Sequence, residues 1–277
     1  MLTRHSLSRS IPVGLVTLLA ASIALLTACA PTPEVTRTPT RLRLGDAADE
    51  AAVLNRLVET YGQTHEWVSF VNDPLPTDEA IDRVRNDHLD LAILPLSPDQ
   101  LGIRLWTSGF AYESLVIVVH PDNPIANVTL IELRDIFQGR TFDWTLFGGA
   151  GEVIPVSREE NSIARKLFEE RVMAGRAVTR NALLKSSAPA VVDFVARTPG
   201  AIGYAPISQV SDRVKVISLE GVIPNPTTAA NGQYGLSSPL YLIARAEPQG
   251  DLREFVGWLL GDEGQKMLSE FGLGRVR

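Results

Sequence analysis

The chain has 277 residues, which is enough for two modest domains with hydrophobic cores. It is acidic, with a formal net charge of −6 from 26 lysine and arginine residues against 32 aspartate and glutamate residues. This balance argues against nucleic acid as a partner and against a polybasic hold on anionic lipid.

The amino end is typical of a secretory signal peptide, predicted at residues 1–28. Residues 7–26 are mostly apolar, and Arg4 and Arg9 lie at their start without any acidic residue. The run ends in Leu-Thr-Ala before Cys29, the single cysteine, which resembles a bacterial lipobox and predicts lipid attachment. The alternatives are a free or intermolecular thiol and an uncleaved membrane anchor, although the apolar run is short for a span. We expect an extracytoplasmic protein anchored to a bacterial membrane.

Residues 29–41 are predicted to be an extended tether, because they hold several prolines and threonines and almost nothing to bury. Beyond it, short strands are expected at 42–44, 67–71 and 89–94. A turn at Gly45 and Asp46 leads into a helix with apolar residues from Val53 to Tyr61, and Thr77 is expected to cap a second helix. This alternation predicts an α/β fold with mostly parallel sheets flanked by helices.

The second half of the body continues the pattern, starting with a β-branched strand at 114–119. Thr129 and Glu132 have capping-box spacing before an apolar helix. Phe142, Trp144 and Phe147 are expected to lie in a core. The other elements expected are a helix at 187–197, strands at 201–205 and 214–218, and helices at 252–260 and 263–271.

Residues 153–175 have the pattern of an anion site. A short buried strand (153–156) is followed by a polar turn at 157–161 and by an amphipathic helix from Ser162 to a stop at Gly175. The first N–H groups of a helix lack intrahelical partners, and Arg158 and Ser162 would add a guanidinium and a hydroxyl donor. The alternative is that Asn161 or Ser162 only caps the helix and that Arg158 only pairs with Glu159 or Glu160.

Motifs for catalysis or metal binding are not found in the sequence. The four histidines are scattered, and no nucleophile elbow, Cys–His pair or phosphate-binding glycine loop with its lysine occurs. We therefore expect no enzyme activity, no metal site and no cofactor.

A resemblance to a known family is carried by SREENSIARKLFEE at 157–170. This segment resembles Ser-Arg-Glu-x-Gly-Ser-Gly-Thr-Arg-x-x-Phe-Glu of the phosphate-binding proteins of phosphate ABC importers. The likeness extends in order from about residue 110 to 272. It implies a two-lobed periplasmic-binding-protein-like fold of type 2, with lobe 1 at 42–112 and 237–277, a crossing at 113–119, and lobe 2 at 120–236.

The resemblance also implies which residues hold the ligand between the lobes. In lobe 2 they are Ser157, Arg158, Asn161 and Ser162, and in lobe 1 they are Gly45 and Asp46. The sequence departs from the family pattern, because Asn161, Ile163 and Ala164 stand where Gly, Gly and Thr are usual. Asp46 replaces a hydroxyl-rich turn and would repel a dianion unless it accepts a proton from it. The family's aspartate near residues 91–96 has no counterpart.

The expected function is a monomeric solute-binding lipoprotein that carries phosphate or a related oxyanion to an ABC permease. Closure of the two lobes about the crossings near Ser114 and Pro239 would give a closed form that is presented to the permease. The alternative is a sensor or scaffold lipoprotein that keeps the fold and no longer serves transport.

Overall fold

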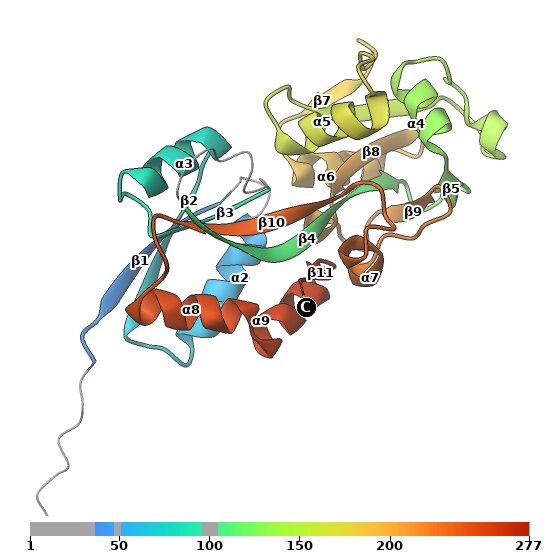
Figure 1. The fold of residues 1–277 in the computed structure, drawn as a ribbon. Coiled ribbons are helices and arrows are strands. Elements are labelled where there is room, and N and C mark those ends of the chain that lie inside the picture. The colour runs from blue at the N-terminus through green and yellow to red at the C-terminus, as the bar shows by residue number, and fades with distance from the viewer. Residues whose placement is uncertain (1–36, 47–50, 96–104, 277) are drawn as a thin grey trace, which may run out of the picture. The chain divides into compact units, whose positions relative to one another are not determined.

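The structure, a computed structural model, describes residues 37–46, 51–95 and 105–276 (Figure 1). The predictions for residues 1–28, for Cys29 and for most of the tether therefore lie outside the described residues. Contacts group Pro39–Arg277 into one compact unit, to which the following description applies.

The first elements form a small parallel sheet in the order β2-β1-β3. Its strands and helices are β1 (Thr40–Asp46), α2 (Ala51–Gly62), β2 (Val68–Pro74), α3 (Thr77–Arg85) and β3 (Leu91–Leu94). All three strands point the same way, so Asp46 pairs with Ile93 where β1 ends. The predicted strand-helix alternation is confirmed here, but the turn expected at Gly45 and Asp46 is wrong, because both residues pair with β2 and β3 within β1. The expected cap is wrong, because Thr77 is the first helical residue and Pro76 holds the N-cap position without a side-chain hydrogen bond.

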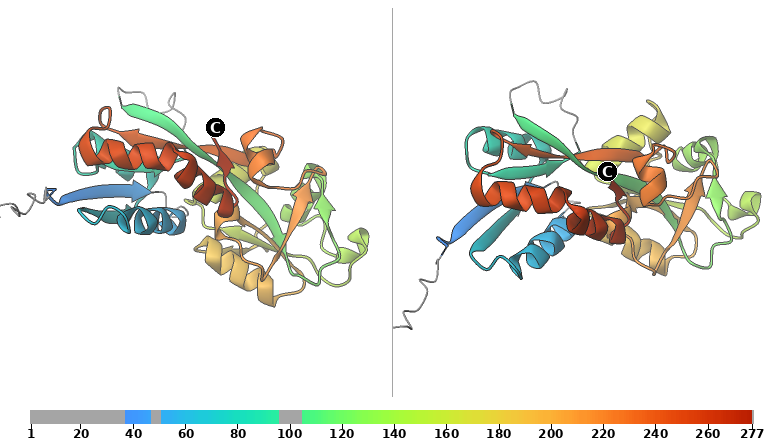
Figure 2. Two further views of the ribbon diagram at one scale, coloured as in Figure 1. Left: turned by 90° about the horizontal axis from the view of Figure 1, so that it is seen from below. Right: turned by 60° about the horizontal axis from the view of Figure 1, so that its bottom comes forward.

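Helices cover both faces of this sheet (Figures 1 and 2). On one face α2 is joined by α8 (Gly250–Leu260) and α9 (Asp262–Glu270), and their apolar residues share a buried cluster with Leu42, Leu44 and Phe110. On the other face α3 and β3 form a separate small cluster that includes Ile81, Leu94 and Ile243. The two terminal helices that the sequence predicted thus complete the core begun by the first strands.

Two antiparallel strands run side by side across the body, namely β4 (Trp106–Val119) and β10 (Ser237–Ala244) (Figure 1). The sequence predicted only the second half of β4, because the continuous apolar run begins at Leu115 and the residues before it mix aromatic, small and polar side chains. The strand nevertheless has 14 residues, and its first half is paired along its length with β10. The hydroxyl oxygens of Ser114 and Ser237 are 2.8 Å apart at this crossing.

The second group of elements lies at the far end of β4, where β8 and β9 pair antiparallel with that strand and β6 pairs parallel with β8 and β7. Its elements are β5 (Asn127–Val128), α4 (Leu130–Phe137), β6 (Ile154–Arg158), α5 (Ile163–Phe168), β7 (Leu183–Lys185), α6 (Ala188–Arg197), β8 (Ala201–Pro206), β9 (Lys215–Leu219) and α7 (Pro226–Ala230). A large buried cluster from Leu115 to Leu236 fills it. Among the named strands, every antiparallel pairing involves β4 or β10.

Side-chain placement in this group agrees with the sequence in part. The capping box of Thr129 and Glu132 is present at the start of α4. Of the three aromatic residues expected in the core, Trp144 is buried and Phe147 is half-buried, but Phe142 is 72% exposed. The core prediction is wrong for Phe142, because Trp144 fills the inward position and its indole N–H donates to the carbonyl of Gly200.

The carboxyl end of the chain returns to β4 through a short strand, β11 (Gly274–Arg275). Gly274 lies so close to α7 that a Cβ atom there would be 2.8 Å from the amide nitrogen of Ala230 and 2.9 Å from the carbonyl oxygen of Pro226. The chain after α9 is therefore packed against an element that precedes β10.

Candidate functional site

Arg158 is the last residue of β6, so the expected turn at 157–161 is wrong for its first two residues. The strand continues because Val156, Ser157 and Arg158 pair with β7. The Arg158 side chain is only 4% exposed and does not point into bulk water. Its Nε and Nη2 atoms each donate to the carboxylate of Glu159 at 3.0 Å, which lowers the pKa of Glu159. The pairing that the sequence left open as an alternative is therefore present.

Ser157 is buried at the same strand end and faces β8. Its hydroxyl oxygen lies 2.8 Å from the hydroxyl oxygen of Tyr204, which also accepts a 3.3 Å hydrogen bond from the main-chain N–H of Arg158. The Tyr204 ring stacks on Phe168 of α5, with centroids 4.1 Å apart and planes at 8°. Burial raises the pKa of Tyr204, so the hydroxyl stays protonated.

Ser162 is the N-cap of α5, as the sequence suggested. Its hydroxyl oxygen accepts a 3.0 Å hydrogen bond from the amide of Arg165, and Asn161 beside it is exposed. The helix has six residues before it widens into a π-helical turn, Glu169–Met173. The chain then reverses through two left-handed residues, the second of which is the predicted stop, Gly175.

The side chain of Ile163, at the first position of α5, takes up the space that a glycine would leave open. It packs against the cluster of Ala80, Ile81, Val84, Leu89, Ala92, Leu94 and Ile243, which belongs to α3, β3 and β10 and the turn before β3. Ala164 is buried as well. The departures from the phosphate-binding pattern at 163 and 164 thus place apolar groups at the helix start where that pattern has open space and a hydroxyl.

Asp46 and Gly45 end β1 on the other side of the crossing strands. Asp46 is fully buried, and its Oδ2 accepts a 2.7 Å hydrogen bond from the side-chain amide of Asn72, whereas Oδ1 has no hydrogen-bond partner. Burial raises the pKa of Asp46, and the hydrogen bond from Asn72 opposes part of this rise. The net pKa is about 6. A Cβ atom on Gly45 would lie 2.6 Å from Cδ1 of Leu89, so the glycine lets Leu89 approach the strand.

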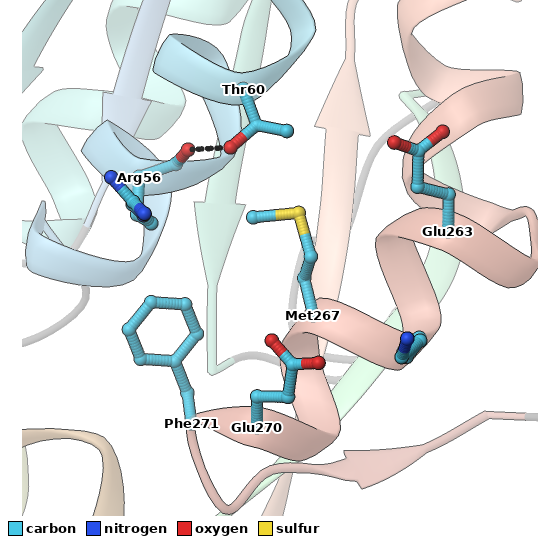
Figure 3. A pocket seen from close by; sticks show the side chains of 7 residues that line it. Arg56, Thr60, Glu263, Met267, Glu270 and Phe271 are labelled. Atoms are coloured by element: carbon cyan, nitrogen blue, oxygen red, sulfur yellow. Dashed lines mark hydrogen bonds between the residues drawn. The ribbon is translucent and has the colours of Figure 1, made fainter.

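An open hollow between α2 and α9 lies away from these residues (Figure 3). It is lined by Arg56, Thr60, Glu263, Lys266, Met267, Glu270 and Phe271. The only hydrogen bond drawn among them joins the Thr60 hydroxyl to the carbonyl of Arg56 one helical turn earlier. None of the predicted ligand residues lines this hollow.

Three residues that support the site were missed from the sequence: Arg165, Tyr204 and Asn72. Arg165 donates from Nη1 to the carbonyl oxygen of Arg158 at 2.9 Å and from Nε to Glu169 at 2.8 Å. The spacing of Arg165 and Glu169 is typical of an ion pair on a helix, but nothing local predicts that the guanidinium reaches back to β6. Tyr204 and Asn72 approach their partners only because strands distant in sequence pair.

The described residues offer binding chemistry more readily than catalysis. In these segments no group of three or more His, Cys, Asp or Glu residues is placed to hold a metal ion. Over the same residues, no helix is both long and apolar enough to cross a bilayer. The end of β6 and the turn after it carry a guanidinium and hydroxyls, which are donors suited to a polar anion, and the end of β1 carries the carboxyl group of Asp46.

The architecture defines a class of protein, a mixed α/β body of two lobes joined by crossing strands. A family model described as a PBP superfamily domain matches residues 35–263, and the chain belongs to this family. The fold class inferred from the sequence is confirmed. Among solved structures, the chain is similar to a phosphate ABC transporter substrate-binding protein from Clostridium perfringens (24% identity, TM-score 0.75, 86% of this chain and 100% of that one).

Other relatives agree with this placement. A phosphate transport receptor from Vibrio cholerae is 25% identical with a TM-score of 0.68, over 84% of this chain and 99% of that one. Phosphate-binding protein PstS of Bacillus subtilis is 29% identical over 57% of this chain and 53% of its own length. The chain thus spans about half the length of the first curated relatives that it matches. The resemblance to phosphate-binding proteins is confirmed, and the relatives are substrate-binding proteins.

Proposed function

We propose that the chain is an extracytoplasmic solute-binding lipoprotein of an ABC importer, which holds phosphate or a related oxyanion between two lobes. The observation that carries the proposal is the buried guanidinium of Arg158 at the end of β6, in a chain segment that also holds the hydroxyls of Ser157 and Ser162. Arginine has several N–H donors in a planar fork, so a guanidinium oriented by Glu159 can also meet an oxyanion. Solved relatives with this fold include one with bound phosphate.

The division into lobes follows the hydrophobic clusters. We propose lobe 1 at 42–112 and 237–277 and lobe 2 at 120–236, with Gly45 and Asp46 facing the ligand from lobe 1 and Asn161 at the rim of lobe 2. Partners would be an ABC permease and the membrane, reached through lipid on Cys29, with the body a monomer and not an enzyme. Mass spectrometry of the amino-terminal peptide tests the lipid, and Cys29→Ser should release the protein from the membrane fraction.

Calorimetric titration of the purified chain tests the ligand, using phosphate, sulfate, molybdate and small carboxylates. We expect binding of at least one oxyanion in the wild type. A loss of about 10- to 100-fold is expected in Arg158→Lys, because a lysine cannot reproduce charge-assisted bonds from a planar fork. Lys166→Met removes an exposed cation from α5, the helix that follows β6, and is the matched control. A wild type that is folded and gives no heat with any of these ions would contradict the proposal.

A second candidate is a sensor or scaffold lipoprotein with the same fold, favoured by the packing of Ile163 against the apolar cluster of α3 and β3. An apolar contact at this position supplies closing energy that does not depend on a ligand. Intact folding without oxyanion binding would favour this role, as would a kinase or regulatory gene beside this one in place of a permease gene.

A further inference from the structure

The peptide unit of Arg158 is held on both sides by side chains. Its N–H donates to the hydroxyl oxygen of Tyr204 at 3.3 Å, and its carbonyl oxygen accepts from Nη1 of Arg165 at 2.9 Å. These two side chains come from β8 and α5, while Arg158 ends β6. The residue whose guanidinium carries the proposed function is therefore fixed through its main chain by two neighbouring elements.

Each of the two side chains is itself immobilised. Tyr204 is fully buried, its ring is stacked on Phe168, and its oxygen lies 2.8 Å from the hydroxyl of Ser157. Because that oxygen accepts the N–H of Arg158, its own hydrogen is best placed to donate to Ser157. The hydroxyl group thus connects both residues at the end of β6.

Arg165 is held in a similar way and is only 12% exposed. Its main-chain N–H donates to the hydroxyl of Ser162 at 3.0 Å, and its Nε donates to Glu169 at 2.8 Å. One residue therefore joins the cap of α5, the end of β6 and an acidic residue one turn further along the helix. A change of angle between α5 and β6 would break at least one of these bonds.

We propose that Arg165 and Tyr204 are positioning residues for the oxyanion site. They fix the main chain of Arg158 so that its guanidinium is oriented before the ligand arrives. Ligand binding to a fixed group avoids the loss of conformational entropy that a mobile arginine would incur, and planar recognition depends on angle. The inference rests on the proposed function and goes beyond it, because neither residue would touch the ligand.

Four variants test the proposal through phosphate titration and thermal unfolding of the full chain. Y204F removes the hydroxyl and keeps the ring stack. R165M removes the guanidinium, whereas R165K keeps a positive charge but cannot donate from two separate nitrogen atoms to Glu169 and to the carbonyl of Arg158. K166M removes an adjacent exposed charge and serves as the control. We expect Y204F and R165M each to weaken phosphate binding by about tenfold, R165K to recover part of that loss, and K166M to leave it unchanged.

A double variant, Y204F with R165M, should lose less affinity than the product of the single losses, because both act on one peptide unit. Without ligand, amide hydrogen exchange of residues 157–159 should be faster in Y204F and in R165M than in the wild type. If unfolding temperatures fall while phosphate affinity stays at the wild-type value, the two residues are only structural and the inference is overturned. If the folded wild type binds none of phosphate, sulfate, molybdate and the small carboxylates, the proposed function fails first, and the inference fails with it.

Discussion

The side-chain amide of Asn72 donates to Oδ2 of Asp46, while the other oxygen of this carboxyl group, Oδ1, is buried without a hydrogen-bond partner. If this carboxyl group were ionised, it would have lost its hydrating water and would be stabilised by only one hydrogen bond, from the neutral amide of Asn72. Burial is accordingly the main cause that raises its pKa to about 6, against an ordinary value of 3.8.

Asp46→Asn should change how stability depends on pH. Because the pKa is raised in the folded state, the folded chain keeps this proton at pH values where the unfolded chain has released it. The stability that comes from protonation is therefore present near pH 4 and is lost as the pH rises through about 6. Relative to the wild type, the asparagine variant should gain up to about 3 kcal/mol between pH 4 and pH 7.

Urea unfolding of both proteins at the two pH values measures this gain. Asparagine has nearly the same size and can still accept from Asn72, so the comparison isolates the charge. A difference in unfolding free energy between variant and wild type that is the same at pH 4 and pH 7 would contradict a raised pKa.

Ile163→Ala tests the apolar contact at the start of α5. The side chain packs against the α3 and β3 cluster, so its truncation should lower the free energy of unfolding by about 1–2 kcal/mol. Ile131, in the first turn of α4, is 67% exposed, and Ile131→Ala should stay within about 0.5 kcal/mol of the wild type. Equal losses in the two variants, measured in urea, would show that Ile163 makes no stabilising contact.

Gly274→Ala should be destabilising because the added Cβ atom would meet main-chain atoms of α7. Overpacking against backbone cannot be relieved by a rotamer change, and a loss of about 1–3 kcal/mol is expected. Gly235, near β10, has open space around its Cβ position and is the matched control, Gly235→Ala. Thermal unfolding should separate the variants. An unchanged midpoint for Gly274→Ala would mean that β11 does not lie against α7 in solution.

Trp144→Ala and Phe142→Ala should differ strongly although the two residues are close in sequence. The tryptophan is buried and donates to the carbonyl of Gly200, so its loss should cost about 3–5 kcal/mol. Phe142 is 72% exposed, and its replacement should change stability by less than about 0.5 kcal/mol. Chemical denaturation of both variants checks this, and a large loss in Phe142→Ala would refute the exposed placement.

Much of the local structure was predictable because it depends on neighbours in the chain. The capping box of Thr129 and Glu132 and the N-cap of Ser162 are bonds across three residues, and the sequence predicts them directly. The pairing of Arg158 with Glu159 was open as an alternative, since adjacent charged residues pair in many environments.

By itself the sequence determined the alternation of strands and helices, the family resemblance and the identity of the charged residues at 157–162. Only the tertiary structure decided which of these residues are buried and what holds them. Strand pairing brings Tyr204 to Ser157 and Asn72 to Asp46. These residues are far apart in the sequence, so no local sequence pattern predicts the contacts. Burial depends on which elements cover a residue, so the packing of Ile163 and the exposure of Phe142 follow from the fold alone.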